Sequence, residues 1–181
     1  MKLFLDLDGV LADFERGVHG VTGRRPEELP LKAMWSALAR VPRFFETLEF
    51  MHDAEALWRF CEPHGPTILT GLPLGAWAPG QKRRWVARMV GAHVPVVACM
   101  ARDKPRWSGP GHVLVDDRAS AREGWERKGA ELRPPAVERL LGDADGARRL
   151  GHRLALRRQH LDLAQLGHDL LRRVRPLPAH R

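Results

Sequence analysis

Four short apolar runs divide the chain, and the stretches between them have helical spacing. The runs lie within residues 2–7, 66–70, 95–99 and 112–115. Each predicts a buried strand, because strands packed on both faces need not alternate polar with apolar residues. Between the second and third runs, residues 76–90 place Trp85 and Met89 on one helical face, with the basic run that starts at Lys82 mostly on the others. Strands that alternate with helices pair in parallel, so the sequence predicts an α/β fold with a parallel sheet.

Residues 14–63 interrupt this alternation directly after the first predicted strand. The segment is rich in aromatic residues and alanine, and prolines punctuate it. Because proline ends or breaks helices, several short helices separated by turns are expected. We therefore predict a small helical insertion over residues 14–63, with residues 1–13 and 64–141 forming the α/β core.

The C-terminal residues 142–181 predict a basic extension. Leu163, Leu166 and Leu170 follow helical spacing beside several arginines, which is typical of an amphipathic helix that docks through its leucines. An anion-binding or nucleic-acid surface is the alternative role for this helix. A final strand after Gly129 is not evident, because the sequence Ala-Glu-Leu-Arg there is followed at once by two prolines.

The charge of the chain is concentrated in this extension. The sequence has 30 basic and 22 acidic side chains and a net charge of +8, which invites a nucleic-acid partner. Residues 1–120 have 16 basic and 14 acidic side chains, a net charge of +2, whereas residues 142–181 have 9 and 4, a net charge of +5. Nucleic acid is therefore a possible partner and not the favoured one.

Other features set the expected compartment. The two cysteines, Cys61 and Cys99, lack the spacing of a zinc site or a disulfide framework. No apolar run approaches the roughly 18 residues of a membrane helix, and Asp6 and Asp8 interrupt the N-terminal apolar run, unlike the core of a signal peptide. We expect a cytoplasmic protein with no membrane partner.

Carboxylates follow the first predicted strand in Phe4-Leu5-Asp6-Leu7-Asp8-Gly9. Acidic groups at the end of a buried strand repel one another and lose hydration, so a divalent cation is the usual compensation. Asp6 and Asp8, two residues apart, can project toward the same side of the edge where open α/β sheets bind ligands. The alternative is an ordinary strand followed by an Asp-Gly turn, with Asp13 as a helix cap.

Adjacent aspartates follow the last apolar run, in Val115-Asp116-Asp117-Arg118. Two acidic clusters at strand ends indicate one site for a hard cation such as Mg²⁺, which prefers oxygen ligands. A helix cap is the alternative role for Asp116 and Asp117.

Two weaker motifs offer groups for phosphate. Thr70 and Gly71 end a predicted strand, where a hydroxyl and backbone N–H groups can hold a phosphate oxygen. Lys104, twelve residues before Asp116, offers an ammonium group. A solvated surface lysine is the alternative for Lys104 taken alone.

In this order the motifs resemble the haloacid dehalogenase superfamily of phosphatases, and in particular its 5′(3′)-deoxyribonucleotidase branch and bacterial relatives. The resemblance covers residues 1 to about 129, including the segment Gln81-Lys82-Arg83-Arg84-Trp85-Val86. It implies a three-layer Rossmann-like core and a small helical cap inserted after the first strand. The sequence departs from that branch at Gly71-Leu72-Pro73, where a small residue followed by proline is usual.

The resemblance also implies roles for individual residues. Asp6 is the expected nucleophile, which forms a phosphoaspartyl intermediate, and Asp8 is the expected general acid and base. The expected ligands of Mg²⁺ are Asp6, the backbone carbonyl of Asp8, and Asp116, with Asp117 supporting them. The groups expected to bind phosphate are Thr70, Gly71, Lys104 and Arg118, and Arg102 is a further candidate.

Aromatic residues of the insertion could bind the organic part of the substrate. Trp35, Phe44 and Phe45 could stack on a nucleobase, or they could form the core of the insertion. The expected function is a Mg²⁺-dependent phosphomonoester hydrolase that acts on nucleoside monophosphates. The alternatives are a sugar phosphate or a nucleic-acid 3′-phosphate as substrate, or a non-catalytic phosphate- or RNA-binding protein that uses the basic extension.

Overall fold

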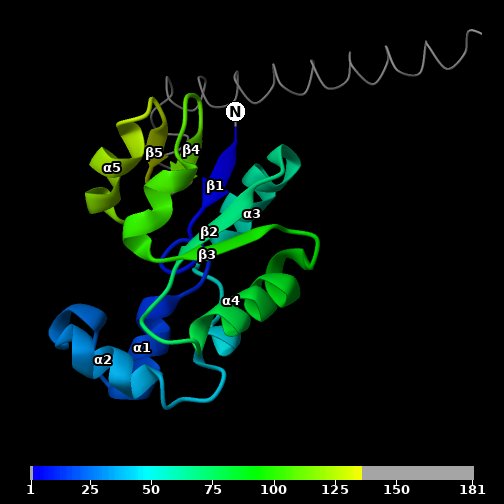
Figure 1. The fold of residues 1–181 in the computed structure, drawn as a ribbon. Coiled ribbons are helices and arrows are strands. Elements are labelled where there is room, and N and C mark those ends of the chain that lie inside the picture. The colour runs from blue at the N-terminus through cyan, green and yellow to red at the C-terminus, as the bar shows by residue number, and fades with distance from the viewer. Residues whose placement is uncertain (1, 136–181) are drawn as a thin grey trace, which may run out of the picture. The chain divides into compact units, whose positions relative to one another are not determined.

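The computed structural model describes residues 2–135, which contain one five-stranded sheet. Its strands are β1 (Leu3–Leu5), β2 (Thr67–Gly71), β3 (Val96–Cys99), β4 (Val113–Val115) and β5 (Glu131–Arg133). All neighbouring strands are parallel, in the order β3-β2-β1-β4-β5 (Figure 1). The predicted α/β fold with a parallel sheet is confirmed. The predicted extension over residues 142–181 lies outside the described residues.

The fifth strand forms where the sequence carries no clear signal. Glu131 pairs with Val113 and Leu132 with Leu114, and the backbone N–H of Glu131 donates to His112 O at 2.8 Å. Leu132 is buried, and the Trp125 indole donates to Glu131 O at 3.1 Å. Glu131–Arg133 contains only one buried apolar side chain, which is too little to predict a strand from the local sequence. The segment is a strand because it pairs with β4, which is distant in the sequence.

Residues 14–64 contain α1 (Phe14–Thr22), α2 (Leu31–Leu38) and α3 (Ala54–Cys61). Short 3₁₀-helical turns lie between and after them: η1 (Pro26–Glu28), η2 (Phe44–Thr47) and η3 (Glu62–His64). Asp13 caps α1, because its side chain accepts a hydrogen bond from the Arg16 N–H at 3.0 Å. Gly23, with a φ of 69°, ends the same helix. Helices α1 and α2 lie beyond the carboxyl end of β1 (Figure 1).

The helix after β2 is α4 (Ala78–Val86), which a π-helical turn η4 (Ala87–Gly91) extends, in place of the single helix predicted for residues 76–90. Trp85 is fully buried, and its indole donates to Leu48 O of the inserted segment at 2.8 Å. Lys82 is also fully buried. The prediction that the basic run lies mostly on the other faces is therefore wrong for Lys82.

Buried Glu46 of η2 joins the inserted segment to α4. Its carboxylate accepts hydrogen bonds from Arg84 at 2.8 Å and Arg43 at 2.6 Å, and its backbone O accepts one from Arg88 at 2.6 Å. The hydrogen bonds from Arg84 and Arg43 lower the pKa of Glu46. The attachment of η2 to the core is thus polar as well as apolar.

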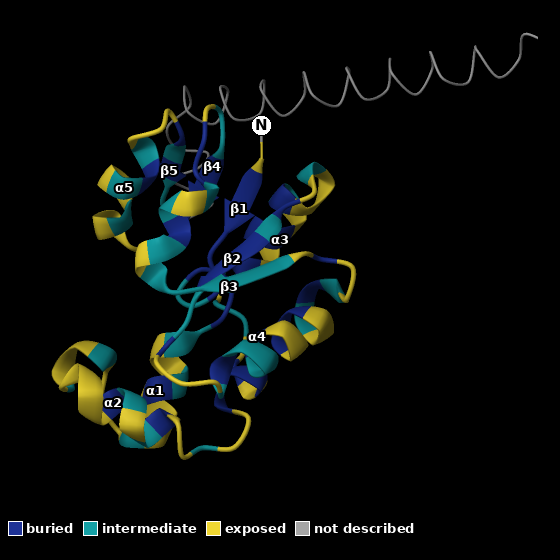
Figure 2. Ribbon diagram, in the orientation of Figure 1, coloured by how far each residue is buried: buried dark blue, intermediate teal, exposed yellow. Residues whose placement is uncertain are grey.

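The inner strands β1, β2 and β4 are buried along most of their length, whereas the edge strands β3 and β5 are largely half-buried (Figure 2). One face packs Phe4, Leu69, Leu114 and Leu132 against Trp125 of α5 (Arg122–Glu126) and Trp107 of the 3₁₀ helix η5 (Ala101–Trp107). Helix α5 lies on one side of the sheet and α3 on the other (Figure 1). Because the chain runs outward from β1 to β3 and then crosses to β4, the strand order reverses beside β1, which is where open α/β sheets bind ligands. Within residues 2–135, the structure contains no helix with the length and apolar character to cross a membrane.

Candidate active site

The carboxyl ends of the strands bring the predicted motifs together. Asp6 directly follows β1, Thr70 lies near the end of β2, and Asp116 directly follows β4. Lys104 belongs to η5, which follows β3. All four side chains are buried, with relative exposures of 3%, 0%, 1% and 3% in the order Asp6, Thr70, Asp116, Lys104. Buried charged groups are rare in proteins unless they are paired, so three of them at one edge of the sheet indicate a functional site.

Lys104 holds two of the carboxylates. Its ammonium lies 2.7 Å from Asp6 Oδ2 and 2.7 Å from Asp116 Oδ2. Asp116 Oδ1 accepts a hydrogen bond from the Arg118 N–H at 2.9 Å, which fixes the aspartate side chain. Burial disfavours the charged ammonium, but the two carboxylates outweigh it and raise the pKa of Lys104. Lys104 therefore stays a cation, and the alternative of a solvated surface lysine is wrong.

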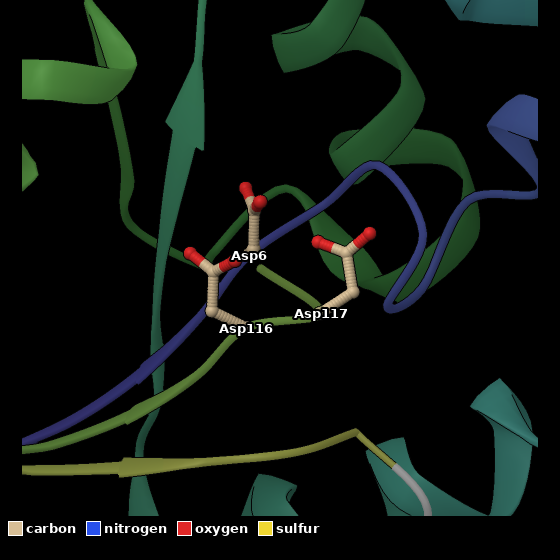
Figure 3. A group of neighbouring side chains, drawn as sticks. All are labelled: Asp6, Asp116 and Asp117. Carbon is tan, nitrogen blue, oxygen red and sulfur yellow. The ribbon is translucent and has the colours of Figure 1, made fainter. Parts of the chain in front are cut away.

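Asp117 completes a group of three carboxylates. One oxygen from each of Asp6, Asp116 and Asp117 lies within 4.8 Å of the others. Figure 3 shows the three side chains next to one another. Burial raises the pKa of Asp6, with Asp116 and Asp8 adding to the effect and Lys104 opposing it. Asp117 is at the exposed side of the group, and partial desolvation next to Asp6 and Asp116 raises its pKa to about 6.

Gly9 makes room for Asp117. The turn after β1 closes through hydrogen bonds from the N–H groups of Leu11 and Ala12 to Leu7 O, at 2.9 and 2.8 Å. Gly9 has a φ of 74°, and a Cβ atom there would lie 2.5 Å from Asp117 Oδ2. A glycine is needed both for the backbone angle and for the close approach of the carboxylate.

A second buried lysine contacts the other carboxylate of the first motif. Lys82 donates to Asp8 Oδ2 at 2.6 Å, to Thr70 Oγ1 at 2.9 Å and to Gly71 O at 2.7 Å. Its ammonium also lies 4.5 Å from the centre of the Phe45 ring. The sequence motifs do not reveal this role, although Lys82 is three residues before the buried Trp85 and so on the same helical face. Thr70 accepts one of these hydrogen bonds, so the same ammonium links its hydroxyl to the Asp8 carboxylate.

The arrangement fits a divalent cation. Within residues 2–135, the buried oxygens Asp6 Oδ1 and Asp8 Oδ1 have no hydrogen-bond partner. Four carboxylates, from Asp6, Asp8, Asp116 and Asp117, face two ammonium groups, from Lys82 and Lys104, which leaves two negative charges. Unpaired buried oxygen and excess negative charge both favour a hard cation with oxygen ligands. Asp8 differs from the other three because its carboxylate pairs with Lys82 and lies outside the group that could hold the cation.

Two cavities adjoin the site. One, of about 280 Å³, lies between η5 and α5, and its lining includes Arg102, Arg118, Lys104 and Asp116. The other, of about 730 Å³, reaches Asp8 and Gly71 and is also lined by Arg118. Arg102 and Arg118 are exposed at these cavities, where each is available to an anionic ligand.

The predicted aromatic residues separate into two groups. Trp35 is partly exposed and lines the larger cavity. Phe44 and Phe45 are buried and line no part of that cavity, in contrast to the prediction that they stack on a ligand. They form the core of the insertion, which was the alternative. Trp77 lines the same cavity, and its only sequence signal is its place in the loop after Thr70.

Comparison with protein-family models finds no match to this chain, and comparison with curated proteins finds none either.

Proposed function

We propose that the protein is a Mg²⁺-dependent phosphomonoester hydrolase that uses Asp6 as a nucleophile. One observation supports this above all. Asp6, Asp8, Thr70, Lys104 and Asp116 lie together at one edge of the sheet, and no group within residues 2–135 donates a hydrogen bond to the buried Oδ1 atoms of Asp6 and Asp8. A site that only binds phosphate needs cations and N–H donors, and two such carboxylates would repel the ligand. The motif resemblance to haloacid dehalogenase phosphatases favours the same chemistry.

In the proposed first step, a carboxylate oxygen of Asp6 attacks phosphorus. The bond between phosphorus and the substrate oxygen breaks, and Asp8, in its protonated form, gives its proton to that oxygen. The organic alcohol leaves, and Asp6 is left as an acyl phosphate. Lys104, 2.7 Å from Asp6 Oδ2, orients the nucleophile and offsets the repulsion between carboxylate and phosphate.

In the second step, the ionised Asp8 takes a proton from water as the water oxygen attacks phosphorus. The bond between phosphorus and Asp6 breaks, which releases inorganic phosphate and restores both aspartates to their starting forms. The free Oδ1 of Asp8 is the atom available for both proton transfers, because Lys82 occupies Oδ2 at 2.6 Å. The Thr70 hydroxyl accepts a hydrogen bond from the Lys82 ammonium at 2.9 Å, so its own proton is suited to hold a phosphoryl oxygen.

Asp6, Asp116 and Asp117 are the groups that would hold Mg²⁺, with the Asp8 backbone carbonyl as a further ligand. When bound, the cation would neutralise negative charge on the phosphoryl group and on the carboxylates. Arg118 and Arg102, at the adjoining cavities, are suited to further contacts with phosphate oxygens.

Nucleoside monophosphates are the proposed substrates. The motif resemblance is to a nucleotidase branch, and the cavity of about 730 Å³ beside Asp8 has room for a nucleoside. Sugar phosphates and nucleic-acid 3′-phosphates are the alternatives within the same chemistry.

Hydrolysis of p-nitrophenyl phosphate with and without Mg²⁺ tests the proposal. We expect Mg²⁺-dependent turnover by the full chain and loss of at least about 10³-fold in Asp6→Asn, because the amide is a poor nucleophile. Asp53→Asn is the matched control, since Asp53 makes no side-chain cap hydrogen bond and lies outside the carboxylate cluster. Equal rates in wild type and Asp6→Asn would refute the proposal.

A further inference from the structure

The cavity of about 280 Å³ between η5 and α5 has no role in the proposed reaction steps. Lys104 and Asp116 line it, so it reaches the carboxylate group, but none of Asp6, Asp8 and Thr70 lines it. In the proposed reaction the phosphoryl group contacts those three residues, so it lies outside this cavity. The volume is just below the usual range for drug-sized ligands, which suits a small chemical group.

Two arginines without carboxylate partners line this cavity. Arg102 belongs to η5 and Arg118 follows β4, and both side chains are exposed. Within residues 2–135, neither guanidinium makes an ion pair or a hydrogen bond. The nearby Arg106, on the same 3₁₀ helix but outside the cavity, pairs with Asp103 at 3.3 Å. The unpaired positive charge of η5 is therefore at the cavity.

The carboxylate group does not need the charge of these two arginines. Lys82 and Lys104 leave two of its four negative charges, and a bound Mg²⁺ would neutralise those two. Arg102 and Arg118 then add two positive charges beside a neutral site. A phosphate dianion has the matching charge, and guanidinium groups bind phosphate oxygens through paired N–H donors.

Asp116 is the carboxylate that lines this cavity in the described part of the chain, and both of its oxygens already have partners. Its Oδ2 accepts a hydrogen bond from Lys104 at 2.7 Å, and its Oδ1 accepts one from the Arg118 N–H at 2.9 Å. The ammonium beside it weakens its repulsion of an anion. Ser120 adds an exposed hydroxyl to the lining, which is a further donor for a phosphate oxygen.

Contacts between the two walls hold this cavity open without a ligand. The Ser108 hydroxyl, directly after η5, donates to Trp125 O of α5, and the Lys128 ammonium donates to Pro105 O at 3.4 Å. Gly124 lets the walls approach closely, because a Cβ atom there would lie 3.1 Å from Pro105 Cγ. A ligand would therefore bind with little cost from ordering the backbone.

We propose that Arg102, Arg118 and Ser120 form a second phosphate site in the cavity between η5 and α5, separate from the site of hydrolysis. The inference rests on the proposed hydrolase function and extends its substrate class to esters with two phosphate groups, one at Asp6 and the other at the arginines. Arg118 lines both cavities, so a substrate held beside Asp8 can reach this site. A free phosphate ion has the same chemistry and is the other possible source.

Calorimetric binding to the Asp6→Asn chain with Mg²⁺ tests the inference without turnover. We expect adenosine 3′,5′-bisphosphate to bind at least about tenfold more tightly than either adenosine monophosphate, because its second phosphate gains charge-assisted hydrogen bonds. In the same background, Arg102→Gln should reduce this ratio of affinities to below about twofold. Arg106→Gln is the matched control, because it makes the same change on the same helix outside the cavity, and it should keep the ratio.

Two further measurements identify the source of the phosphate. Equilibrium dialysis with labelled inorganic phosphate is carried out with adenosine 5′-monophosphate at saturation. Labelled phosphate that stays bound, and is lost in Arg102→Gln, supports a site that a free ion occupies; a bisphosphate preference without it supports a site for the second phosphate of a substrate. Added salt should reduce the bisphosphate preference, because the arginines are exposed. Equal melting temperatures should show that both arginine variants fold.

The inference is overturned if the bisphosphate binds no more tightly than the monophosphates and no labelled phosphate stays bound. It is also overturned if Arg102→Gln and Arg106→Gln weaken binding equally. The two proposals fail separately. Absence of Asp6-dependent hydrolysis with Arg102-dependent binding intact refutes the hydrolase alone, whereas hydrolysis without Arg102-dependent binding refutes the second phosphate site alone.

Discussion

Replacing Lys82 with methionine should destabilise the protein by about 3 kcal/mol. The side chain is fully buried, and its ammonium donates to Asp8 Oδ2, Thr70 Oγ1 and Gly71 O. Methionine fills a similar volume but removes all three donors. Breaking a buried ion pair by removing one partner costs about 3–5 kcal/mol, and we take the lower end because the Asp8 side chain is 16% exposed.

Urea denaturation of the full chain, followed by circular dichroism, measures this loss as a shift of the midpoint at constant slope. Lys128→Met is the control. Lys128 is exposed, and among the described residues 2–135 its one hydrogen-bond partner is Pro105 O at 3.4 Å. Its effect should stay within about 0.5 kcal/mol.

A double-mutant cycle with Asp8→Asn separates the ion pair from simple loss of packing. If the charge on Asp8 is what makes Lys82→Met costly, the double variant should lose about 1–3 kcal/mol less than the sum of the single variants. Strict additivity, or a loss below about 1 kcal/mol for Lys82→Met alone, would refute the reasoning. Additivity would mean that the charge on Asp8 does not cause the loss, and a small loss would mean that water replaces the ammonium group.

Three further predictions test the site and its surroundings. Gly9→Ala should lower the free energy of unfolding by about 2–3 kcal/mol in urea melts, because the new Cβ atom would lie 2.5 Å from Asp117 Oδ2. Gly23→Ala is the control: its φ is 69° but no atom lies near the new Cβ, so the loss should be only about 1 kcal/mol. Equal losses in the two variants would contradict the steric argument. Millimolar Mg²⁺ should raise the melting temperature of the full chain, because it binds the folded state. The rise should be smaller in Asp117→Asn. If Mg²⁺ shifts the melting temperature of neither protein, the proposed cation site is wrong. The fold lowers the pKa of Glu46, so the ionised carboxylate stabilises the protein above its unfolded pKa, and this contribution is lost as the pH falls below about 4.5. In urea melts between pH 6 and pH 3, the free energy of unfolding should therefore decline less steeply in Glu46→Gln than in the wild type. Identical pH profiles would show that the arginine partners of Glu46 do not stabilise the fold.

Sequence pattern was sufficient for the elements whose signals are local. Each of the four apolar runs forms a strand, and the acidic motifs lie at strand ends because a carboxylate cannot continue a strand buried on both faces. The pattern also predicts that Asp6 and Asp116 lie near each other, because carboxyl ends of parallel strands share one edge. Strand β5 could not be predicted, since Leu132 is its one buried apolar residue and its pairing partner β4 lies elsewhere in the sequence.

The chemistry of individual side chains depended on contacts between distant segments. Lys82 belongs to a basic run and becomes a buried partner of Asp8 only because the fold brings α4 close to Asp8 and Thr70. Phe45 and Trp77 are alike in the sequence as aromatic residues, yet one supports a cavity wall from behind and the other forms the wall. The sequence alone determined that four of the five strands form and that carboxylates directly follow two of them, β1 and β4. Only the tertiary structure decided which charges pair and which rings face the cavity, because burial and pairing arise from segments that the chain brings together over long separations.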